Sequence, residues 1–109
     1  MNTSTEPLWT PSSDAVRTSE MVRFMEEANR RFGLSLSDYR QLHAWSVENL
    51  PAFWELVWDF CGVIGDKGAP LLTNGDRMPG AKFFPGAALS FAENMLRKTG
   101  EAPAMIFRG

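Results

Sequence analysis

The chain has 109 residues, of which 44% are hydrophobic, 12% aromatic and 22% charged, as in a soluble globular domain. Its net charge of −2 gives no electrostatic reason to bind nucleic acid, and no apolar run approaches the ~20 residues of a membrane span. The N-terminus lacks the basic start and apolar stretch of a secretory signal, and the single cysteine, Cys61, cannot form an internal disulfide. We therefore expect a cytoplasmic protein with a single hydrophobic core.

Residues 1–13 are rich in Ser, Thr and Pro and predict a flexible leader. A first helix is expected from Thr18 or Ser19 to Arg31, with Gly33 placed to end it in a left-handed conformation. Its predicted buried face follows the spacing of one helical side and comprises Met21, Phe24, Met25, Ala28 and Phe32.

A second helix is expected to begin near Ser37, a residue suited to the N-cap, with Asp38 in its first turn. Its predicted buried side comprises Tyr39, Leu42 and Trp45. Pro51 disfavours helix at Leu50 but is tolerated in the first turn of a new helix, so we expect a tight bend between two helices.

The third helix is unusually aromatic. One predicted face comprises Phe53, Leu56, Val57, Phe60, Cys61 and Ile64, and a second contains Trp54 and Trp58. Only Glu55 and Asp59 solvate it, as a solvent-facing stripe. Because a helix that is apolar on nearly every side has to be surrounded, we expect the two tryptophans to pack against another part of a larger protein.

From Gly62 to Gly86 the sequence is rich in turn signals, including Asn74-Gly75. A short helix is expected from about Ser90 to Lys98, closed by Gly100, with Phe91, Ala92, Met95 and Leu96 directed inward. The final AMIFRG is typical of the beginning of a β-strand, for which residues 1–109 offer no evident partner.

The sequence contains no predicted catalytic, cofactor-binding or metal-binding residue. One histidine and one cysteine exclude the usual zinc sites, and we interpret His43 and Cys61 as packing or surface residues and not as a catalytic pair. In GVIGDKG, Lys67 is followed by Gly68, so this stretch lacks the phosphate-loop motif and is interpreted as turns. The carboxylates Glu26 and Glu27 are expected on a helical surface, and Asp76-Arg77 is either a turn ion pair or a contact to a neighbouring domain.

Three blocks of the sequence together resemble a known family. FMEEANRRFGL, DYRQLHAWSVENLPAFWELVWDF and GDRMPGAKFFPGAALSFAENMLR are similar to the N-terminal region of acetoacetyl-CoA synthetases, acetoacetate–CoA ligases of the adenylate-forming acyl-CoA synthetase superfamily. The resemblance covers about Met21 to Arg108. The chain has Phe83 where the family usually has Trp, and Ser90 where it usually has Asn.

The predicted elements make up a mostly α fold of three to four helices, a turn-rich connection and a short C-terminal strand. The resemblance implies that this fold forms the N-terminal cap of an α/β adenylating enzyme. Residues 14–100 would be the helical domain of the acetyl-CoA-synthetase type, and residues 101–109 the truncated start of the adenylation domain, which would cover Trp54 and Trp58. The family's catalytic motifs lie downstream, so ATP, Mg²⁺ and CoA are implied for the full-length enzyme and not for this chain. A free-standing helical interaction module without catalysis is the alternative.

Overall fold

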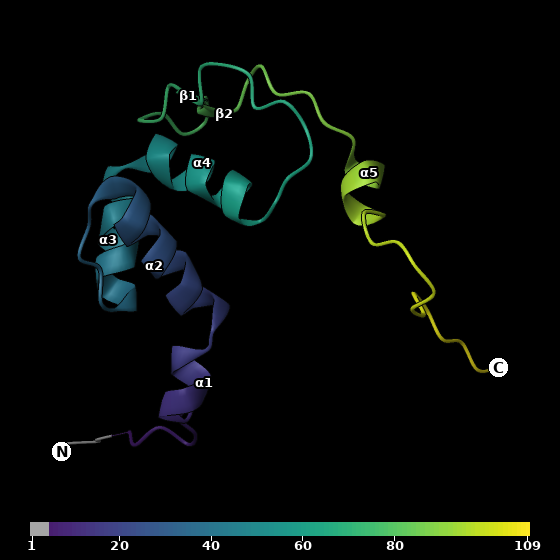
Figure 1. Cartoon of the computed structure of the whole chain (residues 1–109). Coiled ribbons are helices and arrows are strands. Elements are labelled where there is room, and N and C mark those ends of the chain that lie inside the picture. The colour runs from purple at the N-terminus through teal and green to yellow at the C-terminus, as the bar shows by residue number, and fades with distance from the viewer. Residues whose placement is uncertain (1–4) are drawn as a thin grey trace. The chain divides into compact units, whose positions relative to one another are not determined.

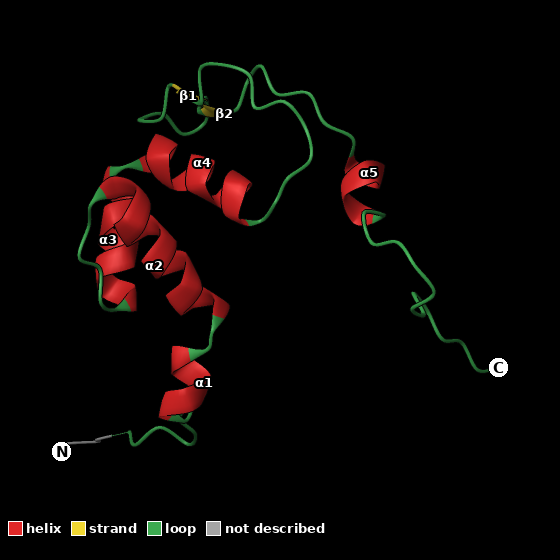
Figure 2. Cartoon of the chain, in the orientation of Figure 1, coloured by secondary structure: helices red, strands yellow, loops and turns green. Residues whose placement is uncertain are grey.

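The computed structural model describes residues 5–109, which divide into two compact units between Glu48 and Asn49. The described chain is mostly helical, as predicted, with five helices instead of three to four, and two short strands (Figures 1 and 2). None of the helices in the described part has the length and apolar character needed to cross a membrane. The elements are α1 (Ser13–Arg17), α2 (Glu20–Phe32), α3 (Tyr39–Glu48), α4 (Leu50–Phe60), β1 (Leu72–Thr73), β2 (Lys82–Phe83) and α5 (Phe91–Met95).

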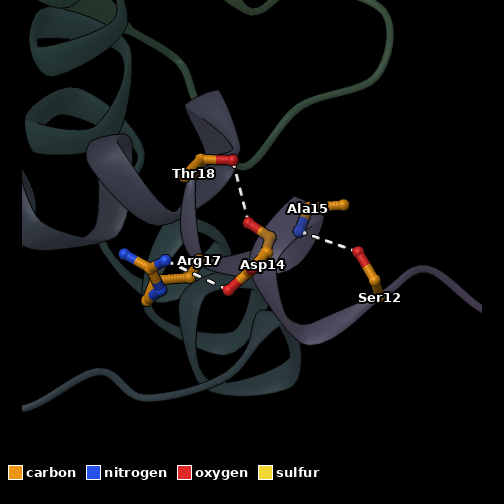
Figure 3. A network of polar contacts seen from close by, with 5 residues as sticks. All are labelled: Ser12, Asp14, Ala15, Arg17 and Thr18. Atoms are coloured by element: carbon orange, nitrogen blue, oxygen red, sulfur yellow. Dashed lines mark hydrogen bonds and ion pairs between the residues drawn. The ribbon is translucent and has the colours of Figure 1, made fainter.

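Helix α1 was not anticipated, and it begins at the last residue of the predicted leader, of which residues 1–4 lie outside the described range. Its single turn is stabilised by local polar contacts and buries none of its own residues (Figure 3). The Ser12 hydroxyl accepts a hydrogen bond from the Ala15 N–H at 3.2 Å, which caps the helix. At the other end, the Thr18 hydroxyl donates to the Asp14 carbonyl at 2.9 Å.

Helix α2 confirms the first predicted helix, beginning one or two residues later and ending one residue later than expected. The Ser19 hydroxyl accepts from the Val22 N–H at 3.3 Å, and Gly33 ends the helix in the left-handed region with φ of 64°. Phe24, Met25 and Ala28 are buried as expected, whereas Met21, on the first turn, is exposed.

Helix α3 begins two residues later than the proposed cap at Ser37. The Asp38 carboxylate accepts from the Gln41 N–H at 2.8 Å, so Asp38 and not Ser37 occupies the capping position. On the predicted buried side, Leu42 is buried and Trp45 packs on Phe32 with ring centroids 5.3 Å apart. Tyr39, expected there too, is exposed because it lies on the first turn of the helix.

The second unit begins with α4, and Pro51 lies in its first turn, as the predicted bend requires. After α4 the chain forms a two-stranded antiparallel pairing in which Leu72 lies opposite Phe83 and Thr73 opposite Lys82. The C-terminal strand expected within 101–109 is not formed. The physical reason is that a strand needs a hydrogen-bonding neighbour, and β1 and β2 pair with each other in this unit.

Candidate functional site

The two tryptophans of α4 contact a phenylalanine pair in the loop that follows the helix. Trp54 meets Phe83 edge-on with ring centroids 5.9 Å apart, and Trp58 meets Phe84 at 5.1 Å. We call Trp54, Trp58, Phe83 and Phe84 the aromatic seam. The tryptophan face of α4 is therefore partly covered by this chain itself, although Trp54 keeps 40% of its surface exposed.

Phe84 adopts a backbone conformation that phenylalanine rarely takes. Its φ is 48°, in the left-handed region, where a side chain with a Cβ is strained. The backbone around it is bonded on both sides, since its N–H donates to the Leu71 carbonyl at 2.8 Å and its carbonyl accepts from the Ala87 N–H at 3.0 Å. This conformation directs the Phe84 ring onto Trp58, so contacts within this unit maintain the strained turn.

Lys67 connects the loop to the acidic side of α4. Its ammonium lies 2.7 Å from the Asp59 carboxylate and 3.2 Å from that of Glu55, four residues earlier on the helix. The hydrogen bond that the Lys67 ammonium donates to Asp59 is the main cause that raises the pKa of Lys67, with Glu55 adding to it and desolvation opposing it. Glu55 and Asp59 keep part of their surface exposed, as expected for the solvent-facing stripe, and the long lysine side chain also reaches them from the loop.

In the glycine-rich stretch around Lys67, three backbone N–H groups donate hydrogen bonds within the second unit. The Ile64 N–H donates to the Asn94 side chain at 2.8 Å, the Asp66 N–H to the Ala88 carbonyl at 2.9 Å, and the Gly68 N–H to the Asp66 carboxylate at 2.9 Å. A Cβ on Gly68 would lie 2.6 Å from the backbone of residue 86, so only glycine allows this approach. The three N–H groups thus bond within the chain, whereas a phosphate-binding loop uses such groups as free donors.

The remaining residues singled out from the sequence are not brought into any catalytic arrangement. His43 on α3 is exposed, and Cys61 is exposed at the end of α4 and not packed on its apolar face as expected. Glu27 pairs with Arg30, whose hydrogen bond lowers the pKa of Glu27. Arg77 closes its turn by donating its N–H to the Asn74 carbonyl at 3.0 Å. Among residues 5–109, no group of three or more His, Cys, Asp or Glu could hold a metal ion.

Helix α5 is held by polar contacts that sequence reasoning missed. The Asn94 side chain accepts from the Ile64 N–H at 2.8 Å and donates to the Ile64 carbonyl and to the Ser90 carbonyl, both at 2.9 Å. Arg97 donates to the carbonyls of residues 61 and 62, at 3.2 and 2.7 Å. The Asn94 side chain thus takes the place of a backbone partner for the Ile64 N–H and carbonyl. A single asparagine within an amphipathic pattern does not indicate such a role.

The apolar residues of the same helix were predicted to point inward, and this prediction is wrong. Phe91, Ala92, Met95 and Leu96 are all exposed. The helix is also shorter than expected, ending at Met95 instead of Lys98. Because its contacts with the rest of the unit are made by Asn94 and Arg97, the apolar residues are left on the other side.

Comparison with known proteins shows which proteins this chain is similar to. No family model matches the chain. It is 52% identical over 103 residues to an acetoacetyl-coenzyme A synthetase of Rhizobium meliloti (strain 1021), covering 94% of this chain and 16% of that protein. An acetoacetyl-CoA synthetase of Danio rerio is 37% identical over 92 residues, covering 83% and 13%. The structure matches acetoacetyl-CoA synthetase from Streptomyces lividans with a TM-score of 0.72 and 35% identity, over 81% of this chain and 14% of that one.

The chain is homologous to the N-terminal region of acetoacetyl-CoA synthetases.

This homology agrees with the resemblance found in the sequence, and the structural match supports the same fold. The chain spans only about a sixth of the acetoacetyl-CoA synthetase of Rhizobium meliloti, 16% of its length. The aromatic seam and the Lys67 contacts therefore belong to a small part of such a synthetase. Within that part, they bind the loop over residues 62–89 to α4.

Proposed function

We propose that this chain is the N-terminal portion of an acetoacetate–CoA ligase. In that reaction the acetoacetate carboxylate attacks the α-phosphorus of ATP, which releases diphosphate and forms an acyl-adenylate. The CoA thiol then attacks the acyl carbon, which releases AMP and gives acetoacetyl-CoA. The observation that carries the proposal is the 52% identity to an acetoacetyl-coenzyme A synthetase across 94% of the chain.

Nothing among the described residues supports an ATP or Mg²⁺ site in this part of the ligase. The glycine-rich loop uses its N–H groups internally, and residues 5–109 contain no cluster of carboxylates or histidines suited to a metal ion. ATP, Mg²⁺ and CoA would accordingly bind to parts of the ligase outside this chain. This portion contributes no catalytic residue in our proposal and acts as a structural cap.

We further propose that the cap associates with the adenylation domain of its own polypeptide, with Trp54 and Trp58 contributing to that contact. The exposed part of Trp54 supports a contribution from this residue. Trp58 is half-buried against Phe84, so its contribution would come mainly through holding the loop in place. The free thiol of Cys61 fits the reducing cytoplasm in which we place the protein.

The first experiment is the intact mass of the native polypeptide that carries this sequence, followed by an assay of AMP formation dependent on acetoacetate and CoA. We expect a mass several times the 12.2 kDa of residues 1–109 and AMP release that requires both substrates. A long polypeptide that releases no AMP with acetoacetate would refute the ligase assignment. Robust turnover by residues 1–109 alone would refute the structural role.

The alternative, a free-standing helical interaction module, is favoured by one observation, the exposed part of Trp54 on α4. It predicts a native mass near 12.2 kDa and a defined oligomer or partner complex. Substituting Trp54 or Trp58 by alanine would then abolish association, whereas in the ligase it would weaken a contact within one polypeptide.

A further inference from the structure

Asn74 and Gly75 form the one Asn-Gly pair in the sequence, and they lie in the connection between β1 and β2 (Figure 1). Both residues are exposed to solvent. Asn74 has φ of 53°, in the left-handed region that asparagine adopts more readily than most residues with a side chain. Its carbonyl accepts a hydrogen bond from the Arg77 N–H at 3.0 Å. The pair thus occupies an accessible turn that is closed by the backbone of Asn74 itself.

Two groups of this pair that can react with each other are not engaged elsewhere in the fold. Within residues 5–109, neither the Asn74 side-chain amide nor the Gly75 backbone N–H forms a hydrogen bond with another residue. Asn29, in contrast, uses its side-chain oxygen and nitrogen in hydrogen bonds of 2.7 and 2.9 Å. Asn94 does the same at 2.8 and 2.9 Å. The fold therefore restrains those two amides and leaves that of Asn74 free to move.

Glycine at position 75 is favoured by close packing. A Cβ there would lie 2.7 Å from a methyl carbon of Leu72, so a larger residue would displace the leucine side chain. Glycine also leaves its own peptide nitrogen sterically open, because it carries no side chain beside that nitrogen. The residue that suits the packing of the turn is therefore also the one that gives its nitrogen the easiest approach to the Asn74 side chain.

We propose that Asn74 is a site of spontaneous deamidation and isomerisation that loosens the β1–β2 hairpin. In the first step the Gly75 nitrogen attacks Cγ of Asn74 and loses its proton, while the side-chain amide nitrogen leaves as ammonia. The product is a five-membered succinimide. Water then adds to one of its two carbonyl carbons and breaks the bond from that carbon to the nitrogen. Opening at Cγ gives aspartate at position 74, and opening at the main-chain carbonyl carbon gives isoaspartate.

Isoaspartate alters the backbone at the point where the hairpin is closed. The main chain then runs through Cβ and Cγ, and the carbonyl that accepts from Arg77 becomes part of a free carboxylate. Thr73, the preceding residue, pairs with Lys82, and Phe83 follows on β2 and contacts Trp54. A changed turn therefore acts directly on the strand pairing that positions Phe83 in the aromatic seam. This chemistry requires no catalytic activity, so it is independent of the ligase assignment.

The reaction can be followed in the native polypeptide that carries this sequence, aged at mildly alkaline pH. Peptide mass spectrometry measures the mass gained when the amide becomes a carboxyl group, and fragmentation distinguishes isoaspartate from aspartate. Asn29 and Asn94 are controls whose amides are hydrogen-bonded, and Asn49 is an exposed control followed by Leu50. We expect Asn74 to react at least about tenfold faster than each of them. A rate at Asn74 no higher than that at Asn49 would overturn the proposal.

Amide hydrogen exchange tests the effect on the hairpin. In polypeptide that carries isoaspartate at position 74, we expect the amides of residues 71–84 to exchange about fivefold faster than in fresh polypeptide, as for the loss of one hydrogen bond. Asn74→Gly suits the left-handed φ and removes the reactive amide, so ageing should leave its exchange unchanged. Asn74→Asp supplies the charge without lengthening the backbone, so its exchange should stay near that of the fresh parent. Equal exchange in fresh and aged parent would overturn the proposal, as would an equal effect of ageing in Asn74→Gly.

Discussion

Replacing Lys67 by methionine should loosen the attachment of the loop to α4. The change keeps most of the side chain's length and removes the charge that lies 2.7 Å from Asp59 and 3.2 Å from Glu55. The three side chains retain 26%, 36% and 30% of their exposure, respectively, so solvent screens both pairs and each contributes up to about 1 kcal/mol.

The variant also leaves two carboxylates four residues apart on one helix without their common cation, which adds about 0.2–0.5 kcal/mol of repulsion. The total loss of stability is therefore about 1–2 kcal/mol, which corresponds to roughly a 5- to 30-fold change in the ratio of closed to open molecules. We expect the α4 amides of the native polypeptide to exchange hydrogen faster by this factor, measured by mass spectrometry.

Two comparisons make the assay specific. Lys82→Met removes a lysine that is exposed on β2 and forms no ion pair within residues 5–109, so it should leave exchange at α4 unchanged. Lys67→Met in a protein that already carries Glu55→Gln and Asp59→Asn should have little further effect, since the charges with which Lys67 interacts are gone. An unchanged exchange rate for the single variant Lys67→Met would refute the reasoning.

The pH dependence of stability provides an independent check that the charge of Lys67 stabilises the folded state. The pKa of Lys67 is raised above its ordinary value of 10.5, chiefly by the hydrogen bond to Asp59. The folded state thus holds the proton more tightly than the unfolded state. The stabilisation is fully present below the unfolded pKa and is lost as the pH rises through the higher folded pKa. In Lys67→Met, this alkaline loss at α4 should be absent.

Three further predictions concern single positions. Phe84→Gly should destabilise the second unit less than Phe84→Ala, by about 1 kcal/mol in urea unfolding, because φ of 48° suits glycine and both variants lose the contact with Trp58; the opposite order would show that backbone strain is unimportant there. Asn94→Ala should cost about 1–3 kcal/mol and speed amide exchange in α5, because Ile64 loses the partner of its N–H and carbonyl; equal exchange in the variant and the parent would contradict this role. Gly33→Ala should cost about 1 kcal/mol of thermal stability through backbone strain alone, since φ is 64° and no atom lies within 4 Å of the added Cβ; a neutral result would disprove it.

The helices of the first unit could be predicted from the sequence because their signals are local. Ser19 and Gly33 lie within one turn of the ends of α2, and the capping hydrogen bond and the left-handed residue involve no distant contact. The same logic misplaced the cap of α3 by one residue, since Ser37 and Asp38 are both good capping residues. Only the hydrogen bond that the Gln41 backbone N–H donates to the Asp38 carboxylate distinguishes them. The family could also be identified from sequence, and homology to acetoacetyl-CoA synthetases confirms it.

The arrangement of the second unit was decided by tertiary contacts. Periodicity placed Trp54 and Trp58 on one side of α4, as their contacts with residues 83 and 84 show. It could not identify those contacts, because the partners lie 29 and 26 residues away along the chain. It also could not bring Lys67 to Glu55 and Asp59, since a flexible side chain and a loop define that contact. For α5, helical spacing correctly grouped the apolar residues and wrongly directed them inward. Spacing defines which residues share a side, and only the polar contacts of Asn94 and Arg97 determine which side faces the fold.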